Sequence, residues 1–164
     1  EGGKTVAFYQ FRHLTFQEYL AAVAAVEGHY DNYIQGQSAL VPLADFLVAD
    51  EWKEVVPMAA VLAKKQAEPL LKQLTLLGSE IEKAFLEGGY TSVDYAWSSN
   101  FRMPAPIARL AQCLIEEAEF SVSSLNDALR LVSIFAHGCV GQENWSALCQ
   151  GPFAEAIYET WWKH

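Results

Sequence analysis

The chain has 164 residues, enough for one domain with a sizeable core, and 52% of them are apolar. Its formal net charge is −9 at pH 7, from 20 acidic and 11 basic side chains, with no stripe of lysine or arginine. An acidic surface repels phosphate backbones, so we expect no nucleic-acid partner. The apolar runs are too short to cross a bilayer and no signal-peptide pattern opens the chain, so we expect no membrane partner and a cytoplasmic protein.

The first predicted elements are an extended segment and a capped helix. Residues 6–12 (VAFYQFR) are rich in aromatic and β-branched side chains, which predicts a short β-like segment. Thr15 and Glu18 then have the spacing of a capping box, in which each side chain accepts a hydrogen bond from the other residue's backbone amide. Gly28 predicts the end of this helix. Apolar residues recur between these ends at helical spacing, namely Phe16, Tyr19, Leu20, Val23 and Val26.

The rest of the chain has the pattern of consecutive helices joined by short turns. Pro57 is expected to kink one helix, and Gly78 to end another before a second capping box formed by Ser79 and Glu82. The fold class predicted is all-α, with helical hairpins packed as a HEAT-like right-handed superhelix or an irregular helical bundle, after the short β-like N-terminal segment. The helices are predicted over residues 38–48, 52–64, 69–78, 79–87, 104–119, 124–138 and 143–149, with a last helix from residue 152.

Two of these helices have a well-defined apolar face, which predicts the side that is buried. In residues 104–119 that face consists of Ile107, Leu110, Ala111, Leu114 and Ala118. In residues 124–138 it consists of Leu125, Ala128, Leu129, Val132, Phe135 and Ala136. We expect Ser123 or Ser124 to cap the second of these helices. The acidic residues Glu116, Glu117 and Glu119 are expected on the solvated face of the first.

Two features near the N-terminus raise the question of phosphate binding. Residues 3–5 (GKT) match the end of a phosphate-binding loop, but the upstream glycine, the preceding strand and the following helix are missing, so we interpret them as a solvated lead-in. His13 lies between the extended segment and Thr15. The residues alone favour a packing histidine at this junction, and the alternative is a phosphate contact at a helix N-terminus.

No arrangement of catalytic residues stands out elsewhere, so we predict no catalytic residue. We expect no metal site and no disulfide framework, because the three cysteines (Cys113, Cys139 and Cys149) lack CxxC spacing and no ligand pair shares a helix face with a carboxylate. Trp161 and Trp162 are adjacent on the last predicted helix and therefore point to different sides. Either both indoles cap the last hairpin, or they contribute to an interface with a partner.

Residues 11–22 (FRHLTFQEYLAA) resemble the FxHxSFQEYLAA signature of NACHT-type STAND NTPases. In that family the signature lies at the end of the winged-helix region that follows the nucleotide-binding domain. The preceding residues 6–10 (VAFYQ) are similar to its β-wing, and residues 52–57 (WKEVVP) are similar to a W-x-E-V-x-P segment that often follows. The resemblance covers residues 6–63.

The resemblance implies a division into residues 1–30, the end of a winged-helix-like region, and residues 31–164, a helical repeat-like domain. It also implies that His13 contacts the phosphates of ADP in the closed, inactive state of the whole protein. The Walker A and Walker B segments of such an NTPase are not in this sequence, and the chain begins with Glu1 rather than Met. We therefore expect part of a longer protein, with no enzymatic activity or cofactor of its own, and ADP or ATP with Mg²⁺ in the parent.

These implications lead to an expected function. The chain would be a non-catalytic regulatory and scaffold part of a NACHT-like signalling NTPase, coupling nucleotide state to a helical sensor or protein-interaction region. Its expected partners are the nucleotide-binding domain of the same parent and a protein ligand or oligomer partner. The alternative is a free-standing helical-repeat module for protein–protein interaction.

Overall fold

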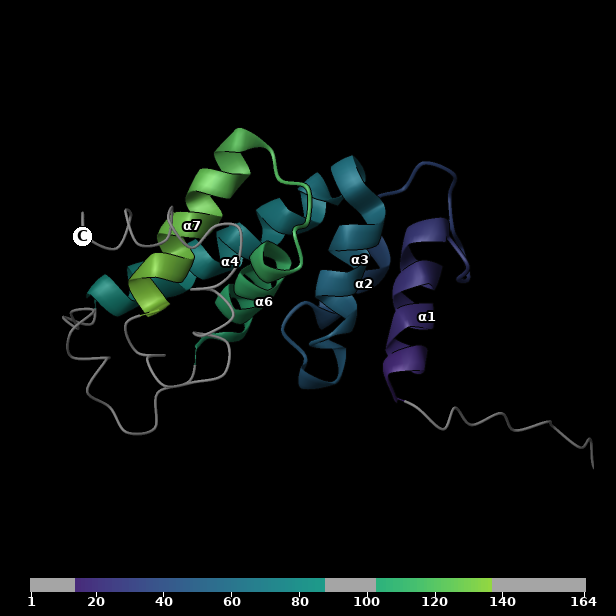
Figure 1. Ribbon diagram of the computed structural model, residues 1–164, viewed down its shortest axis with the longest axis horizontal. Helices are drawn as coiled ribbons and strands as arrows, with labels where there is room; N and C mark the ends of the chain where they lie inside the picture. Colours follow the sequence, from purple (N-terminus) through teal and green to yellow (C-terminus); the bar gives the residue numbers. More distant parts are fainter. Residues whose placement is uncertain (1–13, 88–102, 137–164) are drawn as a thin grey trace, which may run out of the picture.

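The computed structural model describes residues 14–87 and 103–136, and within them every regular element is a helix (Figure 1). The prediction of an all-α fold is therefore confirmed, as a bundle of helices packed against one another. The β-like segment predicted at residues 6–12 and the helices predicted beyond residue 136 lie outside the described residues. The α-helices are α1 (Leu14–Glu27), α2 (Leu40–Leu43), α3 (Val55–Ala63), α4 (Glu68–Glu87), α6 (Ala105–Ile115) and α7 (Val122–Ala136), and the 3₁₀ turns are η1 (Ala44–Phe46), η2 (Asp50–Trp52) and η3 (Lys64–Ala67).

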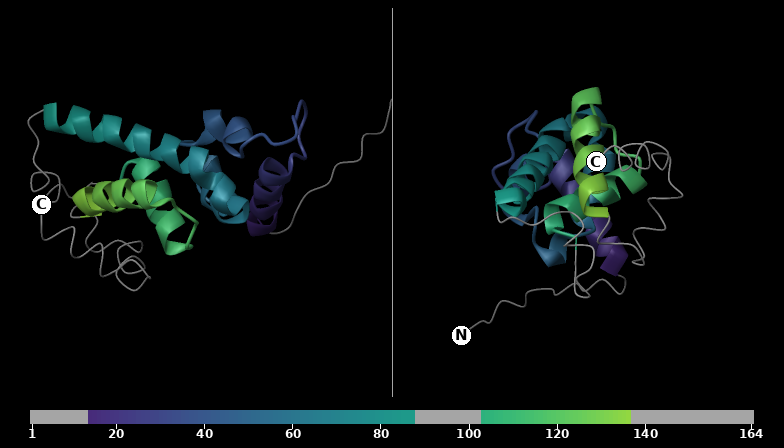
Figure 2. Two further views of the ribbon diagram at one scale, coloured as in Figure 1. Left: turned by 90° about the horizontal axis from the view of Figure 1, so that it is seen from above. Right: turned by 90° about the vertical axis from the view of Figure 1, so that its left-hand side faces the viewer.

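The helices follow one another from one end of the molecule to the other. Helix α1 packs against α3, α3 packs against α6, and α4 packs against both α6 and α7. Figures 1 and 2 show α1 at one end of the described part and α7 toward the other, with the long helix α4 running between these regions. Helix α1 therefore has a neighbour on one side and lies at the edge of the bundle.

The core is built mainly from α3, α4, α6 and α7. The largest fully buried side chains are Leu43, Val56, Pro57, Leu70, Leu71, Leu74, Ile107, Leu110, Leu114, Leu131 and Val132. Four of the five residues predicted for the apolar face of residues 104–119 are buried on α6, and the fifth, Ala118, is buried after the end of the helix. In α7 the predicted residues Ala128, Leu129, Val132 and Phe135 are buried, and Leu125 is partly buried against the core. Burial of these two faces places α6 at the centre of the bundle.

The prediction of two helices between residues 69 and 87 is wrong, because α4 is one helix of 20 residues that continues through Gly78 and Ser79. Gly78 is buried, and a Cβ atom at this position would lie 3.0 Å from Leu131 Cδ1 and 3.3 Å from Ile107 Cγ1. The glycine thus allows α4 to approach α6 and α7 closely instead of ending the helix. Ser79 is an interior residue of α4 and starts no helix.

The helix predicted over residues 38–48 is much shorter than expected, since α2 has only four residues and is followed by η1. The Ser38 hydroxyl accepts a hydrogen bond from the Leu40 amide at 3.1 Å, but the residue directly before α2 is Ala39, which has no capping side chain. Leu43 and Leu47 are buried and anchor the segment on the core. Pro57 lies in the first turn of α3, where backbone amides have no acceptor within the helix, so the helix continues past it to Ala63.

Two helix ends use a residue with positive φ. Gly28 ends α1 as predicted, with φ of 80°, while its amide and that of His29 donate to the carbonyl of Ala24. Helix α6 ends at Ile115 and not at residue 119, because Glu117 takes a φ of 58°. The Glu117 and Ala118 amides donate to the carbonyls of Leu114 and Cys113, which is the Schellman arrangement of a helix end. The acidic residues Glu116, Glu117 and Glu119 therefore follow α6 and do not form its solvated face.

The cap of α7 also differs from the prediction. Ser121, the residue before the helix, accepts a hydrogen bond from the Ser124 amide at 3.2 Å through its hydroxyl. Its carbonyl accepts one from the Leu125 amide at 2.8 Å. The capping residue is thus Ser121 and not Ser123 or Ser124, because α7 already begins at Val122.

Candidate functional site

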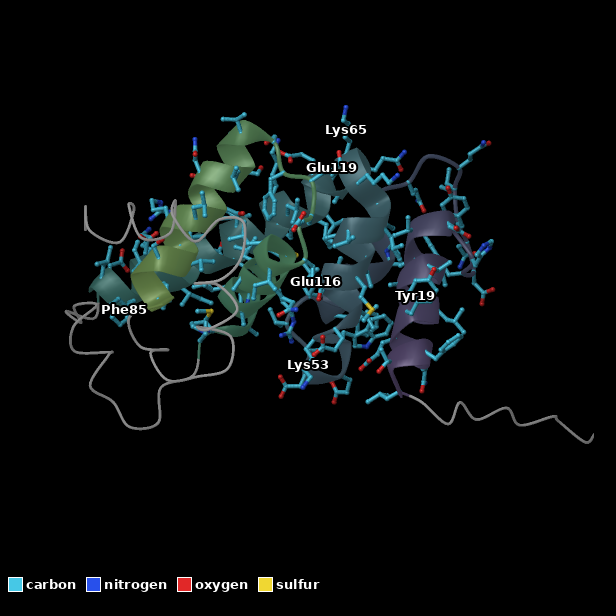
Figure 3. All side chains as sticks on the ribbon, viewed as in Figure 1. Tyr19, Lys53, Lys65, Phe85, Glu116 and Glu119 are labelled. Atoms are coloured by element: carbon cyan, nitrogen blue, oxygen red, sulfur yellow. The ribbon has the colours of Figure 1, made fainter. Side chains whose placement is uncertain are left out.

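Helix α1 has an apolar surface on the side that faces away from the bundle. Its core-facing side is made of small residues, with Ala22 and Ala25 buried against the neighbouring helix. The larger apolar residues Phe16, Tyr19 and Leu20 point outward, with 62%, 47% and 39% of their surface exposed. We call these three residues the outward face of α1; Figure 3 shows Tyr19 on this helix.

The outward face follows from the composition of α1. Polar side chains occur only at Thr15, Gln17, Glu18 and Glu27, so apolar residues surround the helix axis on nearly all sides. A helix that is apolar all round is normally covered on all sides. The described residues cover one side of α1, and the other side is an exposed apolar patch of the kind that marks interaction surfaces.

A groove of about 270 Å³ lies beside this face, between the first half of α1 and the η2–α3 segment. Its apolar surface comes from Leu14 and Ala21 of α1, Trp52 of η2 and Val55 of α3; Gln17, Glu18 and Glu51 add the polar groups. The Trp52 ring is stacked on Phe46, with ring centroids 4.5 Å apart and an interplanar angle of 16°. This stacking holds the indole in place at the side of the groove.

The groove carries negative charge, and no cationic side chain is among its described lining residues. Glu18 and Glu51 line it, and neither carboxylate has a hydrogen bond or ion pair with another described residue. The nearby acidic residues Asp50 and Glu54 instead interact with Arg109 of α6, whose pKa is lowered by burial and raised by these two carboxylates, with a net decrease. Arg109 therefore interacts with the carboxylates of Asp50 and Glu54, and not with those of Glu18 and Glu51, which line the groove.

Arg109 also links the groove segment to the bundle. Its guanidinium donates to the Ala49 carbonyl at 3.2 Å, just before η2, while its Nε has no partner among the described residues. The residue is only 7% exposed, so this bond lies in a largely dry environment where it is stronger than in water. The contact fixes the position of η2, and with it Glu51 and Trp52, relative to α6.

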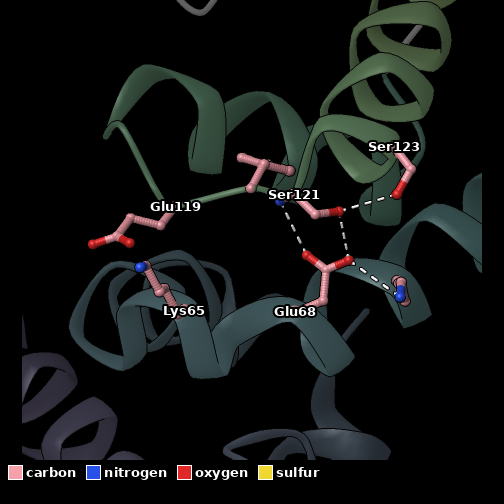
Figure 4. Close-up of a pocket in the computed structure, with 7 residues that line it drawn as sticks. Lys65, Glu68, Glu119, Ser121 and Ser123 are labelled. Atoms are coloured by element: carbon pink, nitrogen blue, oxygen red, sulfur yellow. Dashed lines mark hydrogen bonds and ion pairs between the residues drawn. The ribbon is translucent and has the colours of Figure 1, made fainter.

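A second cavity, of about 500 Å³, lies between the start of α4 and the start of α7 (Figure 4). Glu68 lines this cavity and accepts hydrogen bonds from the Ser121 hydroxyl at 2.7 Å, the Ser121 amide at 3.2 Å and the Ser124 hydroxyl at 2.7 Å. Lys72, one turn further along α4, pairs with the same carboxylate at 3.3 Å. Burial would raise the pKa of Glu68, but these hydrogen bonds outweigh it and lower the pKa to about 2.

This second cavity is poorly suited to an external anion, although two lysines line it. The N-terminus of α7 attracts negative charge, and the Glu68 carboxylate already occupies the position where an anion would bind to it. Figure 4 shows Lys65 pointing toward Glu119, so each lysine faces an acidic residue of the chain itself. The arrangement joins α4 to the start of α7 and is structural.

Among the described residues, no group of three or more His, Cys, Asp and Glu side chains is placed to hold a metal ion. Cys113 is fully buried in α6, and burial raises the pKa of its thiol, which keeps the thiol protonated and unreactive. His29 is exposed and pairs with Glu27 at 3.0 Å. None of the helices in the described ranges is long and apolar enough to cross a membrane.

The residues predicted as sites from the sequence fall into two groups. His13, Trp161 and Trp162 lie outside the described residues. Thr15 and Glu18 lie on α1, where Thr15 is the second residue of the described helix and Glu18 lines the groove. Helix α1 already includes Leu14 and Thr15, and no hydrogen bond joins Thr15 to Glu18, so the capping box predicted for these two residues is wrong. Glu18 lines the groove together with Glu51 and Trp52. Helical periodicity within one segment cannot predict that these residues lie near one another.

The chain matches no protein-family model, no curated protein and no solved structure.

Proposed function

We propose that the chain is a non-catalytic regulatory and scaffold part of a NACHT-like signalling NTPase, in which α1 contacts the nucleotide-binding part of the parent protein. The observation that carries the proposal is the outward face of α1, formed by Phe16, Tyr19 and Leu20. These residues belong to the stretch that resembles the family signature (residues 11–22). A helix with apolar residues on all sides supports a second packing partner beyond α3.

The rest of the chain supports a role as a lever. Helix α1 packs on α3, and α3 packs on α6, in which seven of eleven residues are buried. Proteins pass a displacement through such packed helices because close-packed cores resist deformation. In the proposed mechanism, a change of nucleotide state moves α1, and the α3–α6 contact carries the movement into the bundle. His13 is the proposed phosphate contact, in the whole protein only.

The first test is nucleotide retention by the protein encoded by the complete reading frame that contains residues 1–164. We expect the purified protein to retain ADP, and His13→Ala to increase the rate of ADP loss by about tenfold or more, because a charged hydrogen bond to phosphate is removed. His29→Ala is the matched control, since His29 is exposed and pairs only with Glu27 among the described residues. Equal ADP loss from the two variants would remove the phosphate contact from the proposal.

The alternative is a free-standing module for protein–protein interaction, and the outward face of α1 supports it as well. The two proposals differ in what the complete reading frame encodes. A nucleotide-binding segment with GxxxxGK[ST] before residue 1 favours the NTPase part. A protein that retains no nucleotide and still uses α1 to bind another protein favours the module.

A further inference from the structure

We infer that the groove between α1 and η2–α3 is a docking site for an arginine side chain from a partner peptide segment. The occupant follows from the chemistry of the walls. Glu18 and Glu51 supply two carboxylates that no described residue neutralises, and Trp52 supplies an indole. This inference goes beyond the proposed function, because it holds whether or not the parent protein binds nucleotide.

Charge complementarity selects a cation. The two acidic residues lining the groove face no lysine, arginine or histidine among its lining residues, and the whole chain has a net charge of −9. The neighbouring Lys53 is exposed and does not line the groove; Figure 3 shows it at the lower end of the α2–α3 region. A positively charged side chain would therefore be attracted both by the groove and by the surface around it.

The shape and the apolar walls select arginine over lysine. A guanidinium is planar, less strongly hydrated than an ammonium, and able to bond a carboxylate with two parallel N–H groups. It also stacks on aromatic rings, and Trp52 lines the groove in a position fixed by its contact with Phe46. The methylene stem of the arginine would lie against Leu14, Ala21 and Val55.

The groove is also held in a defined geometry before any ligand arrives. Arg109 bonds the Ala49 carbonyl before η2, and Val55 is buried at the start of α3. Two walls of the groove are therefore tied to the core, and the third is α1, which packs on α3. Such preorganisation reduces the ordering needed on binding.

The test is a titration of the 164-residue chain, labelled with ¹⁵N and observed by NMR, with the peptide acetyl-Leu-Arg-Leu-amide. We expect shifts confined to the groove, at the amides of Gln17 and Val55 and at the Trp52 indole N–H. The matched peptide contains citrulline, which has the same shape as arginine but no charge, and it should bind at least about tenfold more weakly. Equal binding of the two peptides, shifts outside the groove, or no binding of the arginine peptide would overturn the inference.

Two kinds of variant identify the groups responsible. The double variant Glu18→Gln and Glu51→Gln should lower the affinity for the arginine peptide by about tenfold or more. The control double variant, Glu80→Gln with Glu117→Gln, removes the same amount of charge outside the groove and should leave this affinity unchanged. Ala21→Leu fills the groove without a change of charge and should abolish binding. Its control Ala24→Leu lies on α1 outside the groove lining.

The spectrum of each variant reports its own folding, so a loss of binding is interpreted only from a dispersed, native-like spectrum. Unchanged affinity in both groove variants would overturn the inference. The ADP-retention experiment does not depend on these results. The docking site and the proposed function therefore fail separately.

Discussion

Helices α1 and α6 are both rich in apolar residues, yet the structure uses them in opposite ways. In α6, seven of its eleven residues are buried, including the large side chains Ile107, Leu110 and Leu114. In α1, only Ala22 and Ala25 are buried among fourteen residues. An apolar sequence that is not used by the core of the described part is available for a contact elsewhere. The difference between the two helices therefore separates residues that stabilise the fold from residues that we assign to interaction.

The largest expected effect comes from truncating one side chain in each helix. Leu110→Ala should lower the free energy of unfolding by about 2–5 kcal/mol, because it removes a fully buried side chain and leaves a cavity. Phe16→Ala should change it by no more than about 0.5 kcal/mol, because most of that ring is already in water. Urea denaturation of the two variants measures both values. A loss of several kcal/mol in Phe16→Ala would mean that the outward face is covered within the chain itself.

A second prediction concerns the contact that fixes the start of α7 against the start of α4. Glu68→Gln should lower stability at neutral pH by about 1–3 kcal/mol, because a carboxylate with three hydrogen bonds and a lysine partner is neutralised. The folded-state pKa of about 2 lies below the ordinary 4.5, so this stability is fully present above pH 4.5 and is lost as the pH falls toward 2.

Denaturation of Glu68→Gln and the unmodified chain over a series of pH values checks this dependence. The difference between the two should shrink as the pH decreases below about 4.5. Glu80→Gln is the control on the same helix, where the side chain is exposed and makes no ion pair with another described residue. A difference that stays constant down to pH 2 would rule out the proposed role of the Glu68 charge.

The two glycines with positive φ, Gly28 at the end of α1 and Gly36 in the loop that follows, give a third pair to compare. Gly28→Ala should destabilise the chain by at least about 1 kcal/mol, because alanine disfavours the φ of 80°. Its Cβ would also lie 2.5 Å from ring atoms of Tyr33. Thermal denaturation would show a lower midpoint for this variant. Gly36→Ala is the matched control, since Gly36 also has a positive φ but has no atom within 4 Å of the added Cβ. An equal decrease in both variants would show that the Tyr33 contact adds nothing.

The smallest expected effect is a gain in stability at the end of α6. Glu117→Gly should raise the free energy of unfolding by about 0.5–1 kcal/mol, because glycine adopts the φ of 58° without the steric strain of a side chain. Glu119→Gly, at an exposed residue without a positive φ, should give no gain. Calorimetric melting of both variants distinguishes the two cases. A lower melting temperature in Glu117→Gly would contradict the proposed strain.

The sequence predicted α6 and α7 well because each has one apolar face, so periodicity alone identifies the buried side. It failed at Gly78 because a glycine that ends a helix and a glycine that permits close packing look the same in one segment. The outward direction of Phe16 and Tyr19 was also missed. Helical spacing was correct, but alanines on the opposite side of α1 form the contact with α3. The groove could not be predicted, because only tertiary packing brings Glu18 and Glu51 to the lining of one groove.

The central claim is that the outward face of α1 is an interaction surface, and hydroxyl-radical footprinting of the protein encoded by the complete reading frame tests it most directly. Leu20 and Leu76 are both exposed in the described chain, by 39% and 53%, and as two leucines they have the same intrinsic reactivity. If a partner region covers α1, Phe16, Tyr19 and Leu20 will be strongly protected while Leu76 reacts in proportion to its exposed area. Equal labelling of Leu20 and Leu76 per unit of exposed area would contradict the account.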